Sequence, residues 1–233
     1  MIVVQAVALG AVSSVVSGFG FALVCGPALV AALGRAEGVR LTLLLSLLVN
    51  LAVLFRERRE IAWRTALLLA LPAIVTTPLF AVLLDLLPNR AGEALAGFVA
   101  LVGVTVVAAG VRWPAAAGRR GAVGAGVLSA AMNVAAGISG PPVALWADNA
   151  GWSGPRLRGT LQVYFLSLNA VALASLGLPA GEGLATGVLA LVVGVGVGAL
   201  VVHRVSAAAA RRTTLGLAAA GGLAVLIRAV AGG

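Results

Sequence analysis

The 233-residue chain is 61% hydrophobic, has a mean hydropathy of +1.13 and carries charge on only 10% of its residues, well below the roughly 25% usual in soluble domains. Apolar runs of about 18 residues or more recur along its length, which excludes a soluble fold and predicts one membrane domain over residues 1–233. The net charge of +9 reflects arginines in short loops between these runs. Such a distribution indicates membrane topology and gives no reason to expect a nucleic-acid partner.

Helices are the expected spanning elements, because lipid cannot satisfy a free backbone and the apolar runs are too long for alternating strands. We therefore predict an all-α polytopic membrane protein. Its hydrophobic segments follow in chain order at residues 2–33, 41–55, 64–87, 91–111, 121–150, 157–177, 183–203 and 208–230.

These eight segments form two sets of four. A shift of 119 residues aligns the segments of one half with those of the other in order, and it places Gly18 on Gly137. A fixed offset of this kind indicates duplicated halves, here residues 1–111 and 121–230. Duplicated halves are common in secondary transporters.

Segments one and five are each about 30 residues long, and a helix of that length would measure about 45 Å against a hydrocarbon layer of about 30 Å. Both carry glycine or proline near the middle, in "SGFGFALVCGP" and "GISGPP". Each segment is therefore expected to be interrupted. It is either a tilted, broken span or a pair of half-helices that turn back to the side from which they came.

The distribution of the sixteen arginines favours the second arrangement. If all eight segments cross the membrane, the arginines divide equally between its two sides. If segments one and five are re-entrant, all but Arg35, Arg40, Arg90 and Arg228 collect on one side. Basic loops stay in the cytoplasm, so we predict three crossings per half, inverted repeats and both termini outside the cytoplasm.

The interruptions also offer a binding site, because the N-terminus of a half-helix presents unpaired N–H groups and partial positive charge to a buried anion. Gly137 and Gly140 let the backbone approach a ligand closely. Pro141 or Pro142 can open the following half-helix, and Ser139 lies at or near its N-cap. Packing glycines and a simple kink are the alternative interpretation.

Polar side chains within apolar segments supply further candidates. Asn50 and Asn169 coincide under the 119-residue shift, and Gln162 and Tyr164 lie in the helix that follows "GISGPP". Hydrogen bonds between helices are the alternative role for each of them. Arg158, at the start of that helix, is a candidate for attracting an anion to the mouth of a site, or else a solvated arginine that sets topology.

Catalytic and metal-binding patterns are missing from the sequence. Asp85, Glu93, Asp148 and Glu182 fall at segment ends, which disfavours a carboxylate pathway for cations or protons. The chain has one histidine and one cysteine, too few for a metal site or an intramembrane hydrolase. We therefore expect no enzymatic activity, no metal and no cofactor.

The motif "GISGPP" followed by "LRGTLQVYFLSLN" resembles the second-half signature of the sulfite exporter TauE/SafE family, and "SGFGFALVCGPAL" resembles its first-half motif. The resemblance covers essentially the whole chain. It implies a multi-pass permease of the bacterial plasma membrane that moves small anions such as sulfite, or organosulfur and related carboxylate compounds. The functional residues implied by position are Gly18, Phe19, Gly20, Asn50, Gly137, Ser139, Gly140, Pro141, Pro142, Gln162 and Asn169.

The sequence as a whole thus predicts a secondary transporter that exports a small anion by alternating access around a midplane site at broken-helix termini. Its expected partners are that anion and the lipid bilayer, and the sequence specifies neither a coupling ion nor an oligomeric state. A non-transporting structural or assembly subunit is the main alternative. An intramembrane enzyme is a weaker one.

Overall fold

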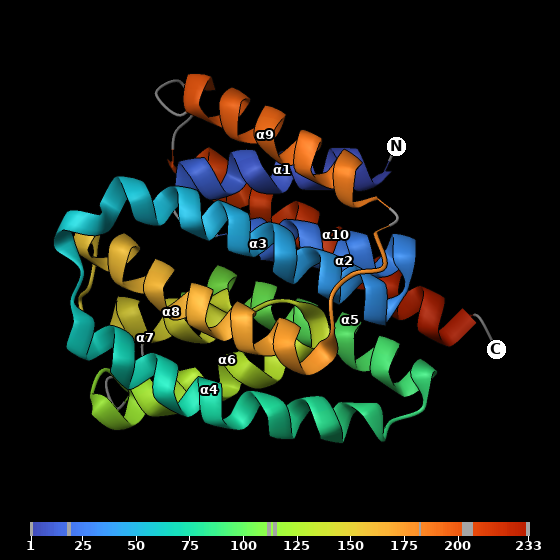
Figure 1. Ribbon diagram of the computed structural model, residues 1–233, viewed down its shortest axis with the longest axis horizontal. Coiled ribbons are helices and arrows are strands. Elements are labelled where there is room, and N and C mark those ends of the chain that lie inside the picture. The colour runs from blue at the N-terminus through green and yellow to red at the C-terminus, as the bar shows by residue number, and fades with distance from the viewer. Residues whose placement is uncertain are drawn as a thin grey trace.

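The computed structural model describes residues 2–17, 20–110, 113, 116–181, 183–201 and 207–231. Within these ranges the chain forms ten α-helices, one 3-10 turn and no β-strand, so the expected all-α fold is confirmed (Figure 1). In chain order the elements are α1 (Ile2–Ser17), α2 (Phe21–Leu33), α3 (Arg35–Glu57), η1 (Arg58–Glu60), α4 (Trp63–Asp85), α5 (Asn89–Ala109), α6 (Arg119–Ala136), α7 (Gly140–Asn149), α8 (Gly154–Leu176), α9 (Leu184–Val201) and α10 (Ala207–Ala231).

The lengths and surfaces of the helices suit a bilayer. In the described part of the chain, α3 with its 3-10 turn, α4, α5 and α8 are long and apolar enough to cross a membrane, and α1, α2, α9 and α10 contain shorter apolar stretches. An exposed apolar stripe runs along α4 at helical spacing. Such a stripe fits contact with lipid tails; it comprises Leu67, Leu71, Val75, Leu79 and Val82.

The first long segment is interrupted, as expected, and folds back on itself. Helix α1 ends at Ser17, and α2 begins at Phe21 after Gly20, whose φ of 132° is accessible mainly to glycine. A methyl group placed on Gly10 would lie 3.0 Å from the carbonyl oxygen of Phe21 and 3.3 Å from Cβ of Cys25. Helix α2 therefore runs back along α1, and we call this pair the first hairpin (Figure 1).

The fifth segment has the same form. Helix α6 closes at Gly137, which has a φ of 72° and donates its N–H to the carbonyl of Asn133 at 2.8 Å. Helix α7 then runs back toward the start of α6, since the indole N–H of Trp146 donates to the carbonyl of Gly118 at 3.4 Å. We call α6 and α7 the second hairpin, and residues 137–139 its tip.

The loops of the bundle collect on two faces. On one of them, which we call the arginine-rich face, an Arg158 nitrogen lies 3.1 Å from a Glu57 carboxylate oxygen, which joins the start of α8 to the end of α3. The backbone N–H of Trp113 donates to the side-chain oxygen of Asn149 on the same face. A fold in which all eight segments crossed would place each of these pairs on opposite faces.

Contacts on the opposite face agree with this layout. The N–H of Ala180 donates to the Glu37 carboxylate at 2.7 Å, joining the loop after α8 to the start of α3. The Arg228 guanidinium donates to the carbonyl of Ala31, joining the end of α10 to the end of α2. The chain therefore crosses the bundle three times in each half, as the arginine distribution predicts.

Helices of the two halves pack in reciprocal pairs. Helix α1 packs on α9 as α6 packs on α4, while α3 packs on α8 and α5 on α10. Glycines let the first two pairs approach closely, because a methyl on Gly194 would lie 2.6 Å from the Ala8 carbonyl oxygen and one on Gly126 would lie 2.4 Å from that of Leu69. Under the predicted 119-residue correspondence, exchanging equivalent helices leaves these pairings unchanged.

Thiol labelling tests the re-entrant topology. In a Cys25→Ala background, we expect Arg58→Cys and Leu178→Cys to react with a membrane-impermeant reagent from opposite sides of the membrane. Both positions are exposed in the structure, and three crossings place them on opposite faces. Labelling of both from the same side would instead support eight full crossings.

Candidate functional site

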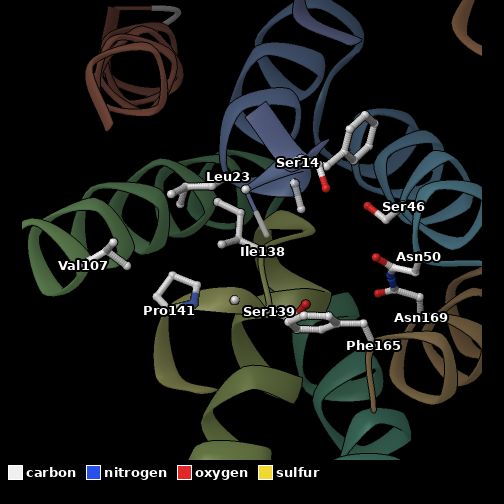
Figure 2. A pocket seen from close by; sticks show the side chains of 14 residues that line it. Ser14, Leu23, Ser46, Asn50, Val107, Ile138, Ser139, Pro141, Phe165 and Asn169 are labelled. Atoms are coloured by element: carbon white, nitrogen blue, oxygen red, sulfur yellow. The ribbon is translucent and has the colours of Figure 1, made fainter. Parts of the chain in front are cut away.

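The two hairpins meet beside a small cavity of about 40 Å³ (Figure 2). This is room for about three water molecules, at 10–15 Å³ for each. Its lining comes from both hairpins and from three further helices. It consists of Ser14, Gly20, Phe21, Ala22, Leu23, Ser46, Asn50, Val107, Ile138, Ser139, Gly140, Pro141, Phe165 and Asn169.

The first turn of α2 faces the cavity. The N–H of Val24 donates to the carbonyl of Gly20 at 3.2 Å, which closes the first helical turn. The N–H groups of Phe21, Ala22 and Leu23 consequently lie ahead of any intrahelical acceptor, and all three residues line the cavity. Together with the helix dipole, they give this wall partial positive charge.

The first turn of α7 also faces the cavity, but it offers fewer backbone N–H donors than the first turn of α2. Ser139 stands at the N-cap, as expected, but its side chain makes no capping hydrogen bond. Pro141 and Pro142 occupy the first turn, where they start the helix but supply no N–H. Gly140 is left as the backbone N–H donor of that turn. The start of α2 therefore presents more N–H donors to the cavity than the "GISGPP" segment, on which the sequence-based prediction centred.

The two asparagines that coincide in the predicted repeat both line the cavity. Asn50 lies on α3 and Asn169 on α8, and Figure 2 shows their side chains next to each other. The side-chain oxygen of Asn169 accepts a hydrogen bond from the amide of Asn133 at 3.0 Å. The NH₂ of Asn169 is therefore the group that it can offer to a ligand.

Ser46 lines the cavity but was not among the residues predicted from the sequence. It lines the cavity one helical turn before Asn50, is only 5% exposed, and its hydroxyl has no hydrogen-bond partner among the described residues. Hydroxyls in apolar helices usually bond to the carbonyl four residues earlier, as Thr42 does at 2.7 Å. The available signal was a serine four residues before a candidate asparagine, which places both on one helix face.

Other predicted residues lie away from the cavity or outside the described part of the chain. Gln162 is buried on the same face of α8 as Asn169, two turns toward the arginine-rich face. The ring of Tyr164 packs in an apolar cluster with Leu69 and Val143 and does not line the cavity. Gly18 and Phe19 lie outside the described residues.

Arg158 lies on the arginine-rich face, outside the cavity lining. Its Nε donates to the Glu57 carboxylate at 3.1 Å, and its side chain is 40% exposed. This ion pair joins α3 to α8, which gives Arg158 a structural partner at the membrane surface.

The tip of the second hairpin is held from two directions. The Ser129 hydroxyl donates to the carbonyl of Ser139 at 2.6 Å from within the hairpin. From the first hairpin, α2 approaches so closely that a methyl on Gly26 would lie 2.9 Å from the Ala136 carbonyl oxygen and 3.4 Å from the Ile138 side chain. The position of the tip at the cavity therefore depends on a glycine at position 26.

We expect Gly26→Ala to lower the thermal unfolding midpoint of the purified protein in detergent. The added methyl must displace the tip, and overpacking of this kind typically costs about 1–3 kcal/mol. Gly124→Ala is the matched control, since a methyl at Gly124 meets nothing within 4 Å. A Gly26→Ala protein as stable as this control would show that the close contact does not hold the tip.

A helical membrane protein in which two re-entrant hairpins aim half-helix N-termini at one cavity, lined partly by serine and asparagine side chains, has the architecture of a secondary transporter. The family model described as sulfite exporter TauE/SafE matches residues 3–225, and the chain belongs to this family. It is therefore a multi-pass membrane protein of a family of anion transporters. Neither the curated proteins nor the solved structures gave a match.

Proposed function

We propose that this protein exports a small anion, such as sulfite or an organosulfur or carboxylate compound, across the bacterial plasma membrane as a secondary transporter. Transport would proceed by alternating access around the cavity between the hairpins. The observation that carries the proposal is the convergence of the α2 and α7 N-termini on one cavity that also contains Ser46, Asn50 and Asn169.

The chemistry of the lining favours an anion. Its donors are backbone N–H groups, hydroxyls and amide NH₂ groups, and no charged side chain occurs among the described residues around the cavity. Hydrogen bonds to a charged ligand contribute about 1.5–3 kcal/mol each, so a few of them can retain an anion. Without a fixed countercharge, the same site can also release it.

The size and polarity of the cavity suit a small substrate. Room for about three water molecules is comparable to the volume of an oxyanion such as sulfite. Figure 2 shows Ser46, Asn50 and Asn169 on one side of the cavity, and Val107, Leu23 and Pro141 toward the other. The apolar side could accept the short substituent of an organosulfur or carboxylate anion.

The membrane potential gives the proposed direction of transport. A potential negative inside favours the exit of an anion by about 2.3 kcal/mol per charge per 100 mV. Export therefore needs no ATP-binding motif.

Flux in proteoliposomes tests the proposal. We expect the protein to carry at least one anion from a panel of sulfite, sulfonates and small carboxylates in a saturable manner. Gly140→Leu should abolish this flux, because the added side chain would occupy space at the start of α7, where Gly140 lines the cavity. Gly124→Leu, a matched change in open space on α6, should leave the flux intact. No saturable flux of any anion would support the alternative of a non-transporting subunit.

Substrate affinity tests the polar side chains that line the cavity. Ser46→Ala and Asn50→Ala should each raise the KM for the transported anion about tenfold or more, because each removes one hydrogen bond to a charged group. Ser175→Ala is the control: Ser175 is exposed on α8, and its hydroxyl bonds to the carbonyl of Val171. An unchanged KM in both site variants would remove them from the binding site.

A further inference from the structure

A second cavity, of about 240 Å³, continues from the first toward the arginine-rich face. It lies between α5 and α7 and shares Val107 and Pro141 with the central cavity. Its other lining residues include Gly110, which follows the end of α5, and the exposed Asp148 near the end of α7. The two cavities thus form a line from the N-termini of α2 and α7 to one face of the protein.

The contact between α2 and α10, on the opposite side of the central cavity, is filled with side chains. Between the central cavity and the other face, residues of α2, α5 and α10 belong to one buried apolar cluster, which includes Leu23, Val30, Ala100 and Val225. Helix α10 also touches α2 closely, since a methyl on Gly221 would lie 2.9 Å from Cβ of Pro27. The contact between α10 and α2 has no space for a methyl at Gly221, and so none for an anion.

The open and the closed regions occupy equivalent places in the predicted repeat. The 119-residue shift relates α2 to α7 and α5 to α10, so the α5–α7 contact corresponds to the α2–α10 contact. Two equivalent contacts of one duplicated fold therefore have opposite forms here: one contains a cavity and the other is tightly packed.

We propose that the gap between α5 and α7 is the route by which the anion passes between the central cavity and the arginine-rich face, with Val107 and Pro141 at its inner end. The tightly packed α2–α10 contact is the equivalent route to the other face, closed in this conformation. Alternating access then consists of closing the first contact and opening the second. This inference rests on the proposed transport function.

The test compares two valine-to-cysteine changes in the Cys25→Ala background: Val107→Cys in the α5–α7 gap and Val225→Cys in the α2–α10 contact. A small, charged methanethiosulfonate reagent is applied separately to each face of oriented vesicles, and Arg58→Cys marks the arginine-rich face. We expect Val107→Cys to react from the face that labels Arg58→Cys. Val225→Cys should not react from that face.

The flux of the same vesicles provides the second measurement. Modification of Val107→Cys should abolish anion flux, because the attached group blocks the inner end of the route. If Val107→Cys does not insert into the membrane, Ala144→Cys on the opposite wall of the gap replaces it.

Several results would overturn the inference: a Val107 thiol that reacts from neither face, one that reacts only from the face opposite Arg58, or modification without loss of flux. Labelling of Val225→Cys from the arginine-rich face would also contradict it. The proposed function fails separately, if the thiols react as expected but the unmodified protein carries no anion.

Discussion

The structure depends on one physical constraint: backbone N–H groups inside a bilayer have no water with which to form hydrogen bonds. Interrupting two helices of a membrane protein therefore creates polar ends that need partners. Here both ends border one cavity, where the first turns of α2 and α7 lie with Ser46, Asn50 and Asn169. Leaving the N–H groups of a helix start and a buried hydroxyl without hydrogen-bond partners costs free energy. A bound anion would accept hydrogen bonds from both.

Close packing by small residues keeps these ends together. Gly10 allows α1 and α2 to form a tight hairpin, and Gly26 allows α2 to touch the second tip. Gly137, the first residue of that tip, has a φ of 72° and turns the chain out of α6. The polar side chains at the cavity are thus few and uncharged. Their positions are set by glycines, which have no side chain that could bind a ligand. A mutational survey limited to polar residues would overlook these glycines.

Much of this arrangement could be predicted from the sequence, because it follows from length and charge. Segments too long for the bilayer, with glycine or proline at their centres, indicate the hairpins, and the arginine distribution indicates that they turn back. The position of a residue along its helix relative to the cavity, and the direction in which its side chain points, were harder to infer. Gln162 and Tyr164 share α8 with Asn169, but only Asn169 reaches the cavity. Ser46 was missed because a lone serine in an apolar helix normally bonds to its own backbone.

The central claim, that an anion binds between the N-termini of α2 and α7, is tested most directly by locating one. Selenite is a heavier analogue of sulfite, and its selenium can be found by anomalous scattering in crystals of the protein grown with sulfur-containing methionine. The account predicts a selenium peak in the central cavity, placed so that the oxygens of the selenite accept hydrogen bonds from the first turn of α2 and from the Ser46 hydroxyl. A selenium peak found only elsewhere, or an empty cavity at selenite concentrations that saturate transport, would contradict it.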